Sequence, residues 1–239
     1  FDAEAHMARL QRSLSELRIA APMSEAALWL VIRETMRRNR VRDGIVYLQV
    51  SRGAPRTRDH VFPARETKPT LVITAKNLDA PAIAERAERG VAVISVPETR
   101  WARRDIKSVN LLPNVLARQA AKEAGAFEAW FVDRDGFVTE GTSSTAWIVD
   151  AGGQLRTRNL SFDLLHGVTR AALLQFARGR DLVVDERPFT VEEAKAAREA
   201  FISSASNPAV GVTHIDGVPV NGAKVGPITR ILRAVYLGA

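Results

Sequence analysis

The sequence predicts an α+β fold of two domains, for three reasons. Helical and strand patterns mix along the 239 residues without the regular strand-helix-strand repeat of a doubly wound sheet. A polar, proline-containing segment at residues 77–81 predicts a linker between the two halves. The composition, with 46% hydrophobic and 26% charged residues, is ordinary for a chain that buries one large core or two smaller ones. We therefore expect a small domain over residues 1–80 and a larger domain over residues 81–239.

The first domain is expected to contain two helices followed by two strands. Residues 2–19 carry apolar side chains at steps of three and four, the stripe of an amphipathic helix. Ser24 is a typical N-cap and opens a second helix that ends near Met36. Alternating apolar side chains predict strands at residues 45–50 and 71–74, joined by a long loop rich in arginine.

The second domain is expected to combine helices with hairpins. The patterns predict a helix at residues 113–124 and a strand at residues 126–132. Asp135-Gly136 is a strong turn signal and leads into a strand at residues 137–139. The later elements are an apolar strand at residues 146–149 and helices at residues 170–178, at residues 191–200 and from residue 228 onward.

The basic composition does not predict a nucleic-acid partner. The formal net charge is +7, but the basic residues are spread along the chain instead of forming one patch beside stacking aromatics. No apolar run approaches the roughly 20 residues of a membrane span, and no signal-peptide pattern is present. The absence of cysteine excludes disulfides and thiolate catalysis. We expect a cytoplasmic enzyme that acts on small molecules, with no metal site.

One lysine and one carboxylate have the surroundings that pyridoxal phosphate chemistry requires. Of the six lysines, Lys107 alone lies in a segment that does not read as a helix face or a turn, so it is the candidate for a Schiff base with the cofactor. Glu140, followed by Gly141 and three hydroxyl residues, is the candidate partner of the pyridine nitrogen, which it would keep protonated. Taken alone, the two residues have plainer interpretations, a surface lysine and a strand-end carboxylate before a turn.

The segments around these two residues resemble the signature of the class IV, or fold type IV, aminotransferases, the family of D-amino acid and branched-chain aminotransferases. The resemblance extends from Phe1 to Gly238. It implies a two-domain fold with the cofactor in the interdomain cleft, and a homodimer whose partner chain completes the active site. Family members carry a segment before the point that Phe1 matches, so we expect the N-terminal part of the small domain to be absent from the numbered sequence.

The resemblance also implies roles for further residues at the cofactor, pyridoxal 5′-phosphate. A phosphate is held best by backbone NH groups at a helix N-terminus, together with hydroxyls and an arginine. Besides Lys107 and Glu140, the implied cofactor residues are Arg9 at the phosphate, Ser143 beside the ring, Leu165 beneath the ring, the phosphate loop Gly167, Val168 and Thr169, and a second hydroxyl loop with Ala205 and Ser206. Individually, these residues read equally as a surface charge, a core leucine, a helix start or a polar loop.

The arginine-rich loop at residues 52–63 predicts recognition of a carboxylate. A guanidinium fork with a second donor beside it fixes the orientation of a carboxylate. Arg58 and His60 supply such a pair and resemble the arginine-x-histidine trap of D-amino acid aminotransferases. The spacing before Arg58 is one residue longer than the common form, so Arg56 competes for this role. Tyr47 is a further candidate for the substrate pocket, and a basic surface loop remains the plainer interpretation.

Together these features predict a D-amino acid aminotransferase that transfers the amino group of a D-amino acid such as D-alanine to 2-oxoglutarate, giving pyruvate and D-glutamate. One alternative is a branched-chain L-amino acid aminotransferase, which is expected to lack the arginine-x-histidine trap. Another is an aminodeoxychorismate lyase, which uses the same cofactor for elimination. A third is a protein that binds the cofactor without catalysis.

Overall fold

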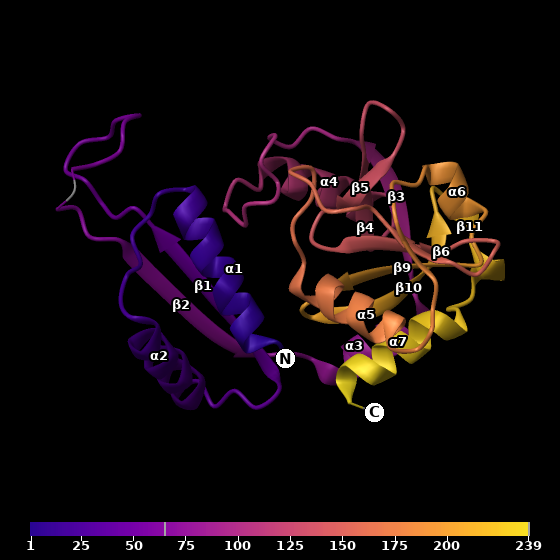
Figure 1. The fold of residues 1–239 in the computed structure, drawn as a ribbon, viewed down its shortest axis with the longest axis horizontal. Coiled ribbons are helices and arrows are strands. Elements are labelled where there is room, and N and C mark those ends of the chain that lie inside the picture. Colours follow the sequence, from indigo (N-terminus) through magenta and orange to yellow (C-terminus); the bar gives the residue numbers. More distant parts are fainter. Residues whose placement is uncertain (65, 239) are drawn as a thin grey trace. The chain divides into compact units, whose positions relative to one another are not determined.

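The computed structural model describes residues 1–64 and 66–238 and divides into two compact units (Figure 1). The smaller unit is Ala3–Ala80, and the larger comprises Pro81–Ala239 together with Phe1–Asp2. Among the described residues, no helix has the length and apolar character that crossing a membrane requires.

The smaller unit is a two-stranded sheet with both of its helices packed on one face. Its elements, in chain order, are α1 (Ala3–Glu16), α2 (Glu25–Arg38), β1 (Gly44–Ser51) and β2 (Thr70–Asn77). The strands pair antiparallel, with Leu48 opposite Ile73, and these side chains pack against Ile32 of α2 and Met7 of α1. Because side chains alternate along a strand, Tyr47 falls on the other face, where it is exposed. The two predicted helices and two predicted strands are confirmed, and the first helix ends earlier than expected.

The larger unit is built on one nine-stranded mixed sheet with five α-helices and a short 3₁₀ turn among its described residues. Its elements are α3 (Ala80–Arg89), β3 (Val91–Pro97), α4 (Leu112–Glu123), β4 (Glu128–Val132), β5 (Val138–Gly141), β6 (Thr145–Val149), β7 (Leu155–Thr157), α5 (Val168–Arg178), β8 (Val184–Glu186), the one-turn α6 (Val191–Lys195), β9 (Glu199–Ser204), β10 (Asn207–Ile215), β11 (Val218–Pro219), the 3₁₀ turn (Asn221–Ala223) and α7 (Pro227–Leu237). The strand order is β5-β4-β3-β10-β9-β6-β7-β8, with β11 paired to β10. Parallel pairs join β3 to β4 and to β10, and β7 to β8.

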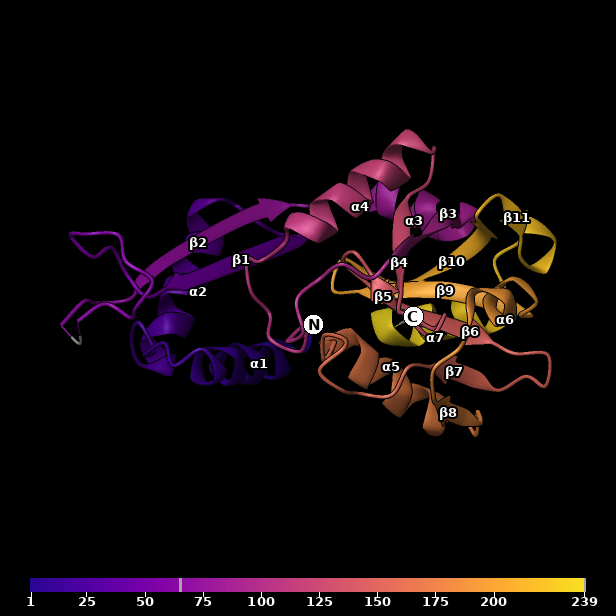
Figure 2. The same cartoon turned by 90° about the horizontal axis from the view of Figure 1, so that it is seen from above.

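The short connection between β5 and β6 requires this sheet to curl. The two strands stand five positions apart in the sheet order, which in a flat sheet is about 24 Å. Yet only Thr142, Ser143 and Ser144 join them, and the chain from Gly141 to Thr145 reaches at most about 14 Å. The sheet must therefore bend until β5 approaches β6, as the curved strands of Figure 2 illustrate.

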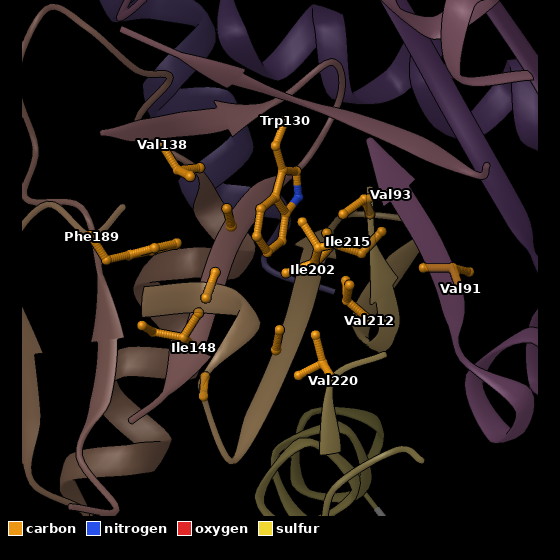
Figure 3. Close-up of a cluster of buried hydrophobic side chains, with 14 of the residues drawn as sticks. Val91, Val93, Trp130, Val138, Ile148, Phe189, Ile202, Val212, Ile215 and Val220 are labelled. Atoms are coloured by element: carbon orange, nitrogen blue, oxygen red, sulfur yellow. The ribbon is translucent and has the colours of Figure 1, made fainter. Parts of the chain in front are cut away.

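The inner face of the curl holds the largest buried cluster. Trp130, Ile148 and Ile202 reach it from β4, β6 and β9, and Phe189 closes it from the loop before α6 (Figure 3). The alternate residues of the same strands point outward. Ala129 and Phe131 of β4 pack under α4. Aromatic and aliphatic side chains of β6 and β9 pack under α5 and α7, and these two helices lie across the curled sheet from α4 (Figures 1 and 2).

The predicted helix at residues 191–200 is wrong in its second half. A capping box between Thr190 and Glu193 begins α6, but the helix ends at Lys195. The following residues form β9, which pairs with both β6 and β10. Ala200 and Ile202 enter the inner cluster while Phe201 faces outward. Burial on both faces of a central strand therefore overrides the local helical propensity of the alanine- and glutamate-rich sequence.

We expect Phe201→Ala to lower the free energy of unfolding by about 3–5 kcal/mol. The ring is fully buried and stacks on Trp147 with the ring centroids 5.3 Å apart. Urea denaturation followed by circular dichroism measures the loss. Val183→Ala, at a site that is 60% exposed, is the control and should change this free energy by less than about 0.5 kcal/mol. Equal losses would contradict the packing described.

Candidate active site

Lys107 lies in the extended segment between β3 and α4, where its backbone is anchored and its side chain is exposed. The two residues before it, Asp105 and Ile106, are buried. The Asp105 carboxylate accepts hydrogen bonds from Arg103 Nε at 2.9 Å and Nη2 at 3.1 Å. This ion pair lies within the segment, directly before the exposed Lys107.

Glu140, the second-last residue of β5, is a buried carboxylate with donors from two different segments. Arg100 Nη1 donates to Oε1 at 2.5 Å, and the backbone NH of Leu165 lies 3.2 and 3.1 Å from the two oxygens. Burial raises the pKa of Glu140, against the opposing effect of Arg100 and of the Leu165 NH group. A carboxylate held in this way is suited to accept a hydrogen bond from a cationic ring nitrogen.

Arg100 connects Glu140 to a second buried carboxylate, Glu98. Its Nη2 lies 2.6 Å from Glu98 Oε2, and its guanidinium lies over the Phe131 ring. Arg104 Nη1 adds a further ion pair to Glu98 at 2.8 Å. Although burial opposes its ionisation, hydrogen bonds and ion pairs with the two arginines lower the pKa of Glu98 to about 2. The two arginines thus balance the charge of two carboxylates inside the protein, where an unpaired charge is costly.

The three hydroxyl residues after Gly141 turn back towards β4. Thr142, Ser143 and Ser144 each donate a side-chain hydrogen bond to Glu128, the first residue of β4. Asn114 of α4 donates to the Thr142 carbonyl at 2.8 Å. Ser143 itself is exposed.

The predicted phosphate loop forms the N-terminus of α5. Gly167 is the N-cap, and Val168 and Thr169 are buried in the first turn, where helix NH groups have no partner within the helix. A Cβ at Gly167 would lie 3.2 Å from both Thr145 Oγ1 and Arg170 Cβ, so the close approach to β6 favours glycine. Leu165 lies two residues upstream, where its NH group contacts Glu140.

The second hydroxyl loop is the tight turn between β9 and β10, with Ala205 and Ser206 at its tip. In the sheet register Ser203 pairs with Thr145, which follows the first hydroxyl loop directly. The larger unit therefore brings Glu140, Ser143, the start of α5 and the 205–206 turn to the same end of the curled sheet.

A family model described as amino-transferase class IV matches residues 1–215. The chain belongs to the class IV aminotransferase family. It is 38% identical over 234 residues to a D-alanine aminotransferase of Staphylococcus haemolyticus, and the aligned residues cover 98% of this chain and 81% of that protein. The structure resembles the branched-chain amino acid aminotransferase of Escherichia coli with a TM-score of 0.88, at 25% identity over 98% of this chain and 78% of that one. It also resembles a putative 4-amino-4-deoxychorismate lyase of Legionella pneumophila with a TM-score of 0.87, at 22% identity over 99% of this chain and 85% of that one.

Membership of the class IV aminotransferases confirms the predicted enzyme class, a transaminase, and the predicted cofactor, pyridoxal 5′-phosphate. The residues described above fit that cofactor: Lys107 would offer an amine, Glu140 a buried carboxylate for the ring nitrogen, and the glycine-capped N-terminus of α5 NH groups for the phosphate. Among the described residues, no group of three or more side chains is arranged to hold a metal ion.

The smaller unit of this aminotransferase carries the other predicted site residues. Arg9 is half-buried on α1 with Nη2 3.3 Å from His6 Nδ1, and burial lowers the pKa of Arg9. Tyr47 donates its hydroxyl to Gln49 at 2.9 Å. Arg58 and His60 are exposed in the loop between β1 and β2. Arg56 in the same loop is equally exposed, so burial does not separate the two candidate arginines.

Two residues that sequence reasoning passed over are Glu98 and Glu128. Each sits at an end of a strand in an otherwise apolar run, and each is buried or nearly so. A charged residue in such a run was the available signal. The arginine partners of Glu98 follow it within six residues, whereas the hydroxyl partners of Glu128 are brought near by the pairing of β4 with β5.

We expect the pairing of Glu98 to make the enzyme more stable above pH 4.5 than near pH 2. A carboxylate whose pKa is lowered on folding stabilises the folded state above its unfolded pKa, and loses that contribution as pH falls through the folded value. The lowering of the Glu98 pKa to about 2 corresponds to roughly 3 kcal/mol in the free energy of unfolding. Thermal melts of wild type and Glu98→Gln between pH 2 and 6 should converge at the acidic end.

Glu34→Gln is the matched control for this pH profile. The pKa of Glu34 is also lowered to about 2, by hydrogen bonds from Arg37 and Arg38, but this cluster lies on the surface of α2. Solvent screens such pairs, so the profile of this variant should stay close to wild type. A Glu98→Gln profile parallel to wild type would show that the buried pair does not contribute in this way.

Proposed function

We propose that this aminotransferase acts on D-amino acids, transferring the amino group of D-alanine to 2-oxoglutarate and giving pyruvate and D-glutamate. The observation that carries the proposal is the buried Glu140 carboxylate, held by Arg100 and the Leu165 NH group beside the N-terminus of α5. The D-alanine aminotransferase relative supports the choice of substrate. The arginine-x-histidine pair in the β1–β2 loop supports the same choice.

Lys107 and Glu140 have complementary roles in this proposal. Pyridoxal phosphate supplies an electron sink that acidifies the substrate Cα–H bond. Lys107 would hold the cofactor through its amine, and the same amine would act as the general base and acid that moves a proton from and to the substrate. Glu140 keeps the pyridine nitrogen protonated, and Arg100 keeps the Glu140 carboxylate oriented.

The other contacts divide between the cofactor ring, its phosphate and the substrate carboxylate. We assign Ser143 and Leu165 to the ring, with Gly167, Val168, Thr169, Ala205, Ser206 and Arg9 at the phosphate, and Arg58, His60 and Tyr47 at the substrate. Arg56 remains the alternative to Arg58. In this proposal residues 81–239 form the cofactor-binding domain and residues 1–80 the small domain. The functional unit is a homodimer in which the partner chain completes the site.

A branched-chain L-amino acid aminotransferase is the second candidate, favoured by the structural likeness to the Escherichia coli enzyme. Arg58 and His60 argue against it, because an apolar L-substrate does not explain two exposed donors in one loop. The absorption of the bound cofactor distinguishes the candidates. Loss of the band on adding D-alanine alone supports the proposal, and loss on adding L-leucine alone contradicts it.

We expect Lys107→Ala to abolish transamination while the protein stays folded, because Lys107 is exposed and its removal leaves the core intact. Borohydride reduction followed by mass spectrometry should place the cofactor on Lys107 in the wild type and on no residue of the variant. Lys122→Ala, an exposed lysine of α4, is the control and should keep both properties. Normal turnover by Lys107→Ala would refute the assignment.

We expect Arg58→Ala to raise KM for D-alanine about tenfold or more, since a charge-assisted hydrogen bond to the substrate carboxylate is lost. Arg56→Ala in the same exposed loop is the matched variant and should change KM by less than about threefold. Steady-state kinetics with D-alanine and 2-oxoglutarate measures both. The reverse ranking would assign the carboxylate to Arg56, and unchanged kinetics in both variants would exclude the loop.

A further inference from the structure

A fully buried carboxylate lies behind the hydroxyl loop and has no part in the reaction as proposed. Glu128 is the first residue of β4 and is 0% exposed. The backbone NH groups of Ala129 and Thr142 donate to its Oε1 at 3.0 and 3.2 Å. Arg118 of α4 reaches the same oxygen at 3.3 Å. A buried charge is tolerated only when it is paired and hydrogen-bonded, and here much of that pairing comes from one loop.

The hydroxyl groups of three consecutive residues all point at this carboxylate. Thr142 bonds to Oε1, and Ser143 and Ser144 bond to Oε2 at 3.2 and 2.9 Å. An ionised carboxylate is an acceptor only, so each hydroxyl must be the donor. The side of the Ser143 hydroxyl that faces away from Glu128 therefore presents lone pairs. A ligand beside this loop would therefore meet the Ser143 hydroxyl as a hydrogen-bond acceptor, because its proton is donated to Glu128.

The loop is also held tightly at its two ends. The Gly141 NH group donates to the Ser144 carbonyl at 2.7 Å. A Cβ at Gly141 would lie 2.3 Å from Ser144 Oγ and 3.1 Å from the Glu128 carboxyl carbon, so no side chain fits there. Gly141 directly follows Glu140, so only one residue separates the Glu140 carboxylate from the hydroxyl loop.

Helix α4 ties the same loop to the segment that carries Lys107. Asn114 and Arg118 are four residues apart and lie on one face of the helix. Asn114 contacts the Thr142 carbonyl, and Arg118 contacts Glu128. The N-terminus of α4 follows the Lys107 segment after only four residues. Helix α4 is therefore joined to the Lys107 segment by the chain, and to the hydroxyl loop and Glu128 by these two side chains.

We propose that Glu128 is a positioning residue for the cofactor: it holds the loop of Thr142, Ser143 and Ser144, and through Gly141 the Glu140 carboxylate, in the geometry that the ring requires. This inference rests on the proposed function, in which Glu140 meets the ring nitrogen and Ser143 lies beside the ring. The competing explanation is that Glu128 only stabilises the fold.

Glu199 provides a matched control for that competing explanation. It is 4% exposed and accepts hydrogen bonds from the NH groups of Ile228 and Thr229, both at 2.9 Å, and from the Thr229 hydroxyl at 2.8 Å. It stabilises the start of α7 and touches no predicted site residue. Glu199→Gln and Glu128→Gln therefore remove comparable buried charges, one remote from the hydroxyl loop and one beneath it.

The experiment measures pyridoxal phosphate affinity and kcat for both variants, at a temperature where circular dichroism shows each to be folded. We expect Glu128→Gln to weaken cofactor affinity about tenfold or more, to shift the absorption band of the bound cofactor, and to lower kcat at saturating cofactor. Glu199→Gln should lower the melting temperature while changing cofactor affinity less than about twofold. Glu128→Asp, which keeps the charge, should recover part of the affinity.

A second variant covers the case in which Glu128→Gln does not fold. Ser144→Ala removes one hydroxyl donor to Glu128 and leaves the carboxylate in place; we expect it to weaken cofactor affinity about threefold or more. If Glu128 and Ser144 variants match Glu199→Gln in affinity, spectrum and kcat, the inference is wrong while the proposed function stands. If the wild type carries no cofactor on Lys107 after borohydride reduction, the proposed function fails, and the inference with it.

Discussion

The three-residue connection between β5 and β6 is the constraint on which the larger unit depends. A chain of that length cannot cross five strand positions of a flat sheet. Closing the distance curls the sheet, and the curl creates an inner face large enough for Trp130, Phe189 and the aliphatic side chains around them. The same connection follows Glu140 and carries the hydroxyl loop. The feature that shapes the core therefore also shapes the candidate active site.

Buried charge is the second organising feature of this site. Arg100 and Arg104 balance Glu98 and Glu140, and Glu128 is balanced by hydroxyl groups, backbone NH groups and Arg118. Each carboxylate has partners from segments that are distant in sequence. Such networks are costly when one member is removed, and they restrict the geometry of every side chain within them. A cofactor that must be held at its ring nitrogen, its phosphate and its aldehyde benefits from that restriction.

How much was predictable differs between elements for a physical reason. The helix opened by Ser24 and the turn at Asp135-Gly136 were predicted, because capping and turn formation depend on neighbouring residues. The first two residues of the strand at residues 199–204 were predicted as the end of a helix, and the strands at residues 155–157 and 207–215 were not predicted. Each of those strands has at least one partner far away in the sequence: β9 pairs with β6, β10 with β3, and β7 with β8. Their stability comes from burial on both faces, which no local pattern records.

The sequence by itself determined the family, the enzyme class and the cofactor, because a lysine, a carboxylate before glycine and a phosphate loop are read from short segments whose spacing the chain preserves. It also identified Lys107 and Glu140 as candidates for the Schiff base and the ring-nitrogen partner, the roles proposed for them above. Only the tertiary structure decided that Arg100 holds Glu140, that Glu128 anchors the hydroxyl loop, and that the turn at residues 205–206 reaches the same end of the sheet as α5. The first contact joins residues 40 positions apart, and the contacts of Glu128 with the hydroxyl loop join residues 14 to 16 positions apart. They exist because the curled sheet brings strand ends together, which is a property of strand order and register and not of local sequence.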